Sequence, residues 1–176
     1  MTEQRRRIDI VLQPEYREGL SDLDLDELRQ RRTTAADVEA QVSYYRRMIH
    51  GRMDLLNFEL RRRDGQEERT LLEALPEILA SGMILGNEPN LKHIEVMPPI
   101  PSKTGRRLID KIMDEGVLIR LPDMPAVEIN EALDRLREVE TELSNQRREL
   151  HAVIDTLQDE IVGRYRNQQD EAAVSG

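Results

Sequence analysis

The chain has 176 residues, of which 35% are charged and only 3% are aromatic, and its formal net charge at pH 7 is −9. It contains no cysteine, which excludes disulfides and thiolate metal sites. It also has no apolar run of about 18 residues, so we expect neither a signal peptide nor a membrane span. The expected lack of both makes a cytoplasmic location the default. An acidic chain repels phosphate on average, so we expect no direct binding of DNA or RNA.

The N-terminal part is predicted to be irregular at first and then helical. Residues 1–20 hold Pro14, which would break an early helix. Residues 21–32 begin with a capping serine, continue with acidic residues and end with basic ones, an order that favours a short helix. Thr33 and Thr34 then offer the N-cap of a further helix.

A long helix is predicted over about residues 35–63, because apolar residues recur there at steps of three and four. This spacing is typical of a helix that packs on another helix along a narrow seam. The pair Asp64-Gly65 marks its end, since glycine is common just past a helix C-terminus. The predicted seam consists of Val38, Val42, Tyr45, Ile49, Leu56 and Leu60.

The middle of the chain is predicted to hold shorter elements. Residues 69–82 indicate a short helix that Pro76 kinks or breaks. Residues 87–103 are rich in proline and are predicted to be extended. Residues 104–116 have the pattern of a short amphipathic helix, and residues 117–122 that of a short strand or a packed loop.

A second long helix is predicted over about residues 126–168, with Pro125 near its first turn and a frayed tail over 169–176. We therefore predict an all-α fold in which two long helices pair as a coiled coil and residues 65–125 connect them. All 176 residues are expected to form one helical domain. The second seam consists of Val139, Leu143, Gln146, Leu150, Ile154, Leu157 and Ile161.

The two long helices carry the same polar pattern, which can be written E-x3-S-x2-R-x3-H-x3-D. Residues 38–60 and 139–161 are identical at nine of 23 aligned positions. At about 100° per residue, the five motif side chains of one helix fall within about 80° of its surface and border its seam. The ten motif residues are Glu39, Ser43, Arg46, His50 and Asp54, and Glu140, Ser144, Arg147, His151 and Asp155.

If the two helices pair, both motifs can line one groove as two equivalent half-sites. An antiparallel pair relates the half-sites by a pseudo-twofold axis and suits a ligand with the same symmetry. A parallel pair does not give this symmetry, and the spacing alone is compatible with both.

The motif residues suit a nucleotide that contains guanine and phosphate. The arginine fork can bind phosphate or the O6/N7 edge of guanine, and the carboxylates can accept hydrogen bonds from the guanine N–H groups. Serine lets a ligand approach the helix closely, and histidine can stack on a base or hydrogen-bond to it. The doublets Arg46-Arg47 and Arg147-Arg148 could form a locally basic pocket for phosphate.

The ordinary interpretation of such residues is a solvated helix face, because Glu–Arg pairs flank the seam of many coiled coils. The repetition favours a binding site instead. Tyr44 and Met48 are replaced by Asn145 and Glu149 in the second copy, while the five polar positions are unchanged.

The doubled motif resembles the E-x3-S-x2-R-x3-Q-x3-D signature of the RsiG anti-sigma factors of actinobacteria. The resemblance covers both motif helices and, more loosely, residues 23–32. It implies an antiparallel coiled coil that binds a dimer of cyclic di-GMP through the ten motif residues and sequesters a WhiG-type sigma factor, which represses transcription. One departure is His50 and His151 in place of glutamine. Histidine can still donate and accept hydrogen bonds, but it can make binding depend on pH near neutrality.

Two alternatives remain open beside this interpretation. In a helical-bundle enzyme, His50, Asp54, His151 and Asp155 would hold a metal, although the arginine one turn before each histidine disfavours a cation there. The other alternative is a ligand-free coiled-coil adapter. Neither Ser43 nor Ser144 has the strand-turn context of a catalytic nucleophile. We expect neither enzyme activity nor a bound metal. Residues 104–122 could cover the coiled coil or contact the partner.

Overall fold

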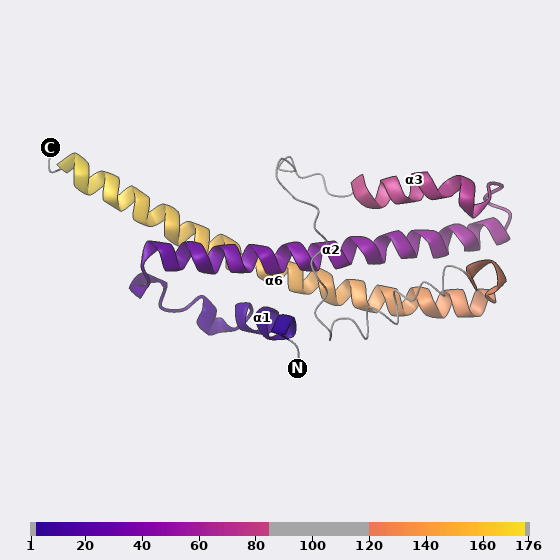
Figure 1. The fold of residues 1–176 in the computed structure, drawn as a ribbon, viewed down its shortest axis with the longest axis horizontal. Coiled ribbons are helices and arrows are strands. Elements are labelled where there is room, and N and C mark those ends of the chain that lie inside the picture. The colour runs from indigo at the N-terminus through magenta and orange to yellow at the C-terminus, as the bar shows by residue number, and fades with distance from the viewer. Residues whose placement is uncertain (1–2, 85–119, 175–176) are drawn as a thin grey trace. The chain divides into compact units, whose positions relative to one another are not determined.

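The computed structural model describes the backbone of residues 3–84 and 120–174, and the side chains of residues 7–78 and 120–170. All regular elements in this described part are helical, which confirms the predicted all-α fold (Figure 1). In chain order they are α1 (Glu3–Val11), η1 (Pro14–Tyr16), η2 (Leu20–Asp22), α2 (Leu25–Arg63), α3 (Leu71–Ile84), η4 (Leu121–Asp123) and α6 (Ala126–Val174), where η marks a 3-10 helix.

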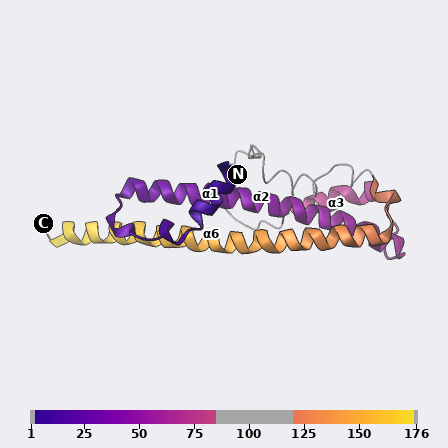
Figure 2. The ribbon, with the colours of Figure 1, turned by 90° about the horizontal axis from the view of Figure 1, so that it is seen from below.

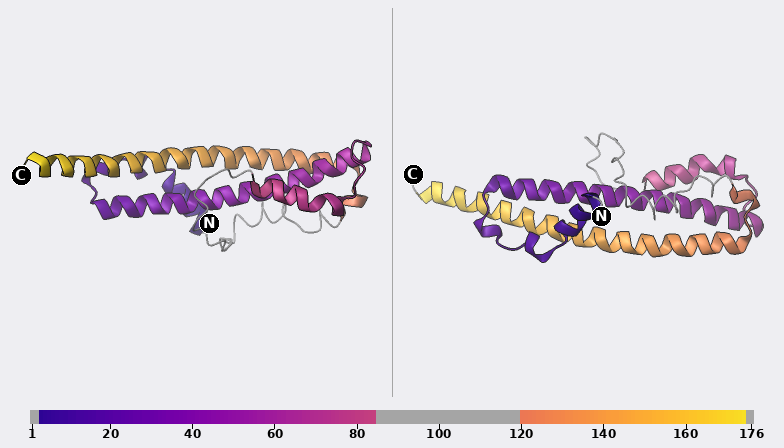
Figure 3. Two further views of the ribbon diagram at one scale, coloured as in Figure 1. Left: turned by 90° about the horizontal axis from the view of Figure 1, so that it is seen from above. Right: turned by 60° about the horizontal axis from the view of Figure 1, so that its bottom comes forward.

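The chain divides into two compact units, and each unit contains part of α2 and part of α6. The first unit consists of Met1–Val42 and Asn145–Gly176, and the second of Ser43–Ser144. In each unit the two long helices lie side by side (Figures 2 and 3). They run in opposite directions: in the second unit Arg46 contacts Glu140, whereas Arg63, further along α2, contacts Met124, just before α6 begins. The predicted pairing of two long helices is confirmed, and its direction is antiparallel.

The first long helix begins ten residues earlier than predicted. Its first turn is fixed by a capping box, in which the Glu27 backbone N–H donates to the Asp24 carboxylate at 2.7 Å. The Asp24 backbone N–H donates in turn to the Glu27 carboxylate at 3.1 Å. These reciprocal bonds satisfy two donors that a helix N-terminus otherwise leaves unpaired.

The predicted break at Thr33 and Thr34 is wrong, because α2 continues through both residues. The reason lies in the seam. Leu28 and Ala35 are both 0% exposed, so buried residues continue at helical spacing towards the N-terminus. A helix whose apolar face stays buried gains nothing by ending at two threonines, whose capping preference is a weaker effect.

The internal duplication is longer than the sequence alignment of residues 38–60 and 139–161 indicated. The 3-10 helices η2 and η4 occupy equivalent places, since each comes just before one long helix. Leu20 in η2 and Leu121 in η4 are both buried, and they are offset by the same 101 residues as Glu39 and Glu140. Each repeat therefore comprises a 3-10 turn followed by a long helix.

In the second unit, an arginine near the end of α2 holds the turn that leads into α6. The Arg63 guanidinium donates to the backbone carbonyl oxygens of Leu121 at 2.8 Å, Pro122 at 3.2 Å, and Met124. Arg63 also donates to the carboxylate of Glu59 at 2.7 Å, and Glu59 is only 2% exposed. The turn is thereby tied to α2 by charge-assisted hydrogen bonds.

The first unit repeats this arrangement with the equivalent arginine. Arg164, in the C-terminal part of α6, donates to the carbonyl oxygens of Leu20 and Leu23, in the turn that leads into α2. It also donates to the carboxylate of Glu160 at 2.9 Å. The same Glu-x3-Arg pair thus fixes the entrance to the opposite long helix in each unit.

The end of α2 agrees with the prediction. Gly65 has a left-handed backbone with φ 71°. Its N–H donates to the Arg62 carbonyl at 3.2 Å, and the Gln66 N–H donates to the Arg61 carbonyl at 2.9 Å. This pair of bonds is the Schellman motif, which commonly ends helices at a glycine.

Two glycines of the second unit should respond in opposite ways to replacement by alanine. Gly51 lies inside α2, with nothing within 4 Å of the position of an added Cβ, so Gly51→Ala should raise the free energy of unfolding by about 0.5–1 kcal/mol. Gly65→Ala should lower it by about 1 kcal/mol, because an L-residue is strained at that positive φ. Thermal unfolding followed by circular dichroism measures both changes. A lower melting temperature for Gly51→Ala would contradict an open helix surface at this position.

The helix α3 packs on α2 within the second unit. It begins with a capping box in which the Thr70 N–H donates to the Glu73 carboxylate at 2.7 Å. Pro76 lies inside α3 and does not break it; Pro76 and Leu72 are both exposed, so water can bind the Leu72 carbonyl that the proline leaves without a donor. The buried contact between the helices consists of Leu55, Phe58, Ala74 and Ile78, with Leu71 and Leu75 at its edge.

The other predictions of secondary structure need correction or lie outside the described residues. From residue 3 onward the N-terminal segment is not irregular, since it forms α1 and then η1, and Pro14 stands at the start of η1. The tail predicted to fray is helical up to Val174, the end of α6, where no glycine or proline interrupts the last turns. Leu121 and Pro122 belong to η4 and not to a strand. The predicted elements at 87–103, 104–116 and 117–119 lie outside the described residues.

Among the described helices, none combines enough length with enough apolar residues to cross a membrane.

Candidate functional site

In the second unit, the glutamate of one motif contacts the arginine and the histidine of the other motif. The Arg46 Nε–H on α2 donates to Glu140 Oε1 on α6 at 2.9 Å, and His50 Nε2 lies 3.2 Å from the same oxygen. Ser144 Oγ donates to Glu140 Oε1 at 2.7 Å and accepts from Arg46 Nε at 2.8 Å. Four of the predicted site residues therefore form one hydrogen-bonded cluster.

In the first unit, the arginine and histidine contacts recur with the roles of the helices exchanged. The Arg147 Nε–H on α6 donates to Glu39 Oε1 on α2 at 3.0 Å. His151 Nε2 lies 3.3 Å from that oxygen. The atoms and distances match those of the second unit within 0.1 Å. The two units thus hold equivalent half-sites, each built from both long helices.

The direction of pairing follows from these charges, a signal that the sequence analysis missed. With parallel helices in register, each motif residue would lie beside its own copy, so that glutamate would meet glutamate and arginine would meet arginine. Like charges that face one another destabilise a helix pair. With antiparallel helices, glutamate meets arginine in both units, as observed for Glu39 with Arg147 and Glu140 with Arg46.

The exposure of the motif side chains differs with their roles in the cluster. The two glutamates are the least exposed of these ionic side chains, at 17% for Glu39 and 20% for Glu140, whereas Arg46 and Arg147 are 34% and 36% exposed. Asp155 is exposed and Asp54 is half-buried. The remaining motif residues, Ser43, His50, Ser144 and His151, are all half-buried.

The motif aspartates stand apart from the clusters. Within the described part of the chain, neither Asp54 nor Asp155 has a hydrogen-bond or ion-pair partner. The structure therefore brings together the glutamate, arginine and histidine of each half-site, but leaves both aspartate carboxylates as acceptors for donors from elsewhere.

The Glu140 carboxylate stays ionised in its cluster. Burial alone would raise the pKa of Glu140, but hydrogen bonds from Ser144 and Arg46 outweigh it and hold the pKa below its ordinary value. The Arg46–Glu140 pair is therefore intact at neutral pH. Since the Nε side of Arg46 faces Glu140, its two Nη groups, which have no partner among the described residues, remain available to a ligand.

The described side chains give no support to the alternative of a metal site. Within residues 7–78 and 120–170, no three or more His, Asp or Glu side chains gather in a way that could hold a metal ion. The histidines instead face the carboxylates that already bind arginine.

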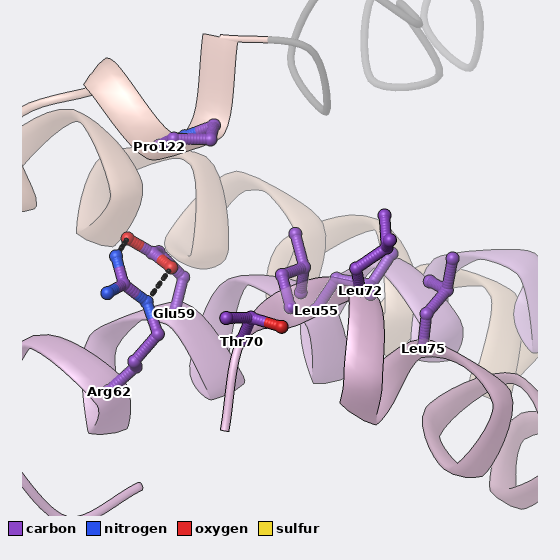
Figure 4. A pocket seen from close by; sticks show the side chains of 8 residues that line it. Leu55, Glu59, Arg62, Thr70, Leu72, Leu75 and Pro122 are labelled. Carbon is purple, nitrogen blue, oxygen red and sulfur yellow. Dashed lines mark hydrogen bonds and ion pairs between the residues drawn. The ribbon is translucent and has the colours of Figure 1, made fainter. Parts of the chain in front are cut away.

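An apolar cavity of about 450 Å³ lies beside α3 in the second unit, and the sequence analysis did not predict it. Its polar members, Glu59 and Arg62, bind each other at 2.8–2.9 Å, as the dashed lines in Figure 4 show. Leucines spaced along α3 were the sequence signal for this surface. The cavity offers no converging polar groups for a nucleotide. Its lining consists of Leu55, Glu59, Arg62, Thr70, Leu71, Leu72, Leu75 and Pro122.

Comparison with known families gives one finding. A family model described as RsiG-like matches residues 14–79 and 119–175. The two matched stretches make up more than half of the chain and include all ten motif residues. No curated protein matches this chain.

Proposed function

Because the chain belongs to the RsiG-like family of anti-sigma factors, its partner is a sigma factor, and we propose that cyclic di-GMP controls their association. In this proposal the ten motif residues bind a dimer of cyclic di-GMP. The loaded protein then sequesters a WhiG-type sigma factor and represses transcription. The chain acts as a regulator and not as an enzyme.

The observation that carries the proposal is the equivalence of the half-sites. The Arg46–Glu140 and Arg147–Glu39 pairs have the same atoms and nearly the same distances in two separate units. Two equivalent sets of donors and acceptors suit a ligand that presents the same groups twice. A dimer of a cyclic dinucleotide is such a ligand.

The polar groups in each half-site match guanine chemically. The Asp54 and Asp155 carboxylates can accept from the N1–H and the exocyclic amine of a guanine base. The Nη groups of Arg46 provide two parallel donors for acceptors such as O6 and N7 of guanine. Glu140 fixes the arginine through its Nε and keeps the fork in one orientation, so less conformational freedom is lost when a ligand binds.

A second function has one observation in its favour. The Arg–Glu pairs link the two long helices to each other, as they would in a coiled-coil adapter whose polar flanks only stabilise the helix pair. The adapter needs no nucleotide to hold a sigma factor. The two functions therefore differ in whether the affinity for the partner depends on cyclic di-GMP.

Isothermal titration of the protein with cyclic di-GMP, with and without a WhiG-type sigma factor, tests the proposal. We expect heat of binding at micromolar nucleotide and tighter binding of the sigma factor when nucleotide is present, since ligand and partner are coupled. Cyclic di-AMP is the matched control, because it has the same backbone but lacks the guanine O6 and amine groups. No heat with cyclic di-GMP in either setting, together with undiminished sigma binding, would favour the adapter.

A further inference from the structure

The two arginines of each doublet have different surroundings. Arg46 and Arg147 are half-buried and bound to a glutamate. Arg47 is exposed and has no hydrogen-bond or ion-pair partner among the described residues. Arg148 is also exposed, and its one hydrogen bond within the described chain is a long contact of 3.5 Å to the Asn145 side chain. In each doublet, the charge of one arginine is thus compensated by a carboxylate, and the charge of the other is not.

The charges of the motif show why the second arginine matters. Each motif has one glutamate and one aspartate against one arginine, so with neutral histidine it carries one net negative charge. A phosphodiester is also negative, and like charges at short range disfavour binding. Arg47 and Arg148 bring the net charge of each motif to zero. They are also present in both copies of the repeat, although most residues between the motif positions differ.

The exposed arginines lie next to the motif residues on the helix surface. In the second unit, Arg47 precedes His50 by three residues and Asp54 by seven, spacings that place side chains on one side of a helix. In the first unit, Arg148 has the same spacing to His151 and Asp155.

Beside each exposed arginine, the helix surface carries only a small side chain or none. The residue four positions further on is small in both copies, Gly51 and Ala152, and an added Cβ at Gly51 would meet nothing within 4 Å. A ligand can therefore approach the backbone there.

We propose that Arg47 and Arg148 bind the phosphates of the nucleotide, while Arg46 and Arg147 bind its guanine bases. The inference rests on the proposed function and assigns roles within its site. Neutralised arginines with a fixed orientation suit the directional edge of a base. Exposed arginines with an uncompensated charge suit a phosphodiester, because they can offset its negative charge through charge-assisted hydrogen bonds.

Titration of cyclic di-GMP into the full chain tests the assignment. Arg47→Ala and Arg148→Ala should each weaken binding roughly tenfold or more at low salt, as expected for the loss of a charged hydrogen bond. The loss should shrink at about 1 M salt, where the screening length falls to about 3 Å. Arg47→Lys and Arg148→Lys should bind nearly as well as the unchanged chain, because lysine keeps the positive charge.

The matched control is Arg166→Ala. Arg166 is exposed, has no described partner and lies about five turns beyond Arg148 on the same side of α6. Its replacement should leave the affinity unchanged. Circular dichroism should show the same helix content in all variants, since none of these side chains supports the fold.

The outcomes distinguish failure of the proposed function from failure of the arginine assignment. If the unchanged chain does not bind cyclic di-GMP, the proposed function and this assignment both fail. If it binds and the two alanine variants bind equally well, the assignment alone is wrong. If lysine is as damaging as alanine, the exposed arginines act through their planar shape and not as phosphate-binding charges.

Discussion

Under the proposed function, replacement of Arg46 or Arg147 by alanine should weaken cyclic di-GMP binding about a hundredfold without unfolding the protein. Each substitution removes two donors that can bind one guanine edge, worth about 1–3 kcal/mol. It also leaves Glu140 or Glu39 without its arginine, so the negative charge of that carboxylate is no longer offset by a permanent cation. Together these effects reach about 3 kcal/mol, or about two orders of magnitude in the dissociation constant. Isothermal titration measures the loss.

The control for this prediction is Arg135→Ala. Arg135 lies on the exposed side of α6 and pairs only with Glu131, at 3.5 Å, among the residues that the structure describes. Its replacement should leave the affinity as it is. If both Arg46→Ala and Arg147→Ala bind cyclic di-GMP with wild-type affinity, these arginines are not part of the nucleotide site.

The second large effect is on stability, and we expect it at Arg63. Arg63→Ala should lower the free energy of unfolding by about 2–4 kcal/mol, because it removes charge-assisted bonds to three carbonyl groups and to a buried carboxylate. Urea unfolding followed by circular dichroism measures the change. Arg164→Ala, at the equivalent place in the first unit, should act in the same direction.

Arg61→Ala is the matched control for Arg63→Ala. Arg61 lies in the same last turn of α2, so it interacts equally with the helix dipole. Its side chain is exposed and has no partner in the described part of the chain. We expect a change within about 0.5 kcal/mol. An equal loss from Arg61→Ala would mean that the helix end needs positive charge in general, and not the bonds that Arg63 makes.

The acid dependence of stability reports on the same cluster. Hydrogen bonds from Arg62 and then Arg63 hold the pKa of Glu59 below its ordinary value despite burial. A lowered pKa in the folded state contributes stability above the ordinary value of about 4.3, and this contribution is lost as the pH falls through the folded pKa. The difference in free energy of unfolding between the wild type and Arg63→Ala should therefore become smaller in acid, where Glu59 is protonated in both proteins.

The sequence predicted the elements whose signal is local and periodic. Both long helices, the glycine that ends α2 and the ten motif positions follow from spacing along one chain segment. The start of α2 was placed wrongly because two threonines have capping preference, whereas the helix is capped by Asp24. Its earlier start is favoured by the burial of Leu28 and Ala35, which depends on packing against another part of the chain.

Contacts between distant segments could not be predicted in the same way. The sequence pattern suggests that Glu59 is an ordinary surface glutamate, yet it is 2% exposed. Its local partners Arg62 and Arg63 only offset the cost of burying its charge. The hydrogen bonds of Arg63 to residues 121–124 join positions about sixty residues apart. No local sequence pattern predicts them. The pairing of Glu39 with Arg147 did leave a signal in the sequence, the opposite charges at antiparallel register. That signal becomes readable only when both pairings of the helices are compared.

The exchange of partners between the helices has a consequence for a divided chain. Since each half-site takes its glutamate from one long helix and its arginine from the other, neither α2 nor α6 carries a complete recognition element. Under the proposed function, a cut within residues 85–119 would yield two fragments, neither of which would bind cyclic di-GMP when alone. Reassembly of the fragments would restore recognition, so cyclic di-GMP would act as a chemical inducer of their association.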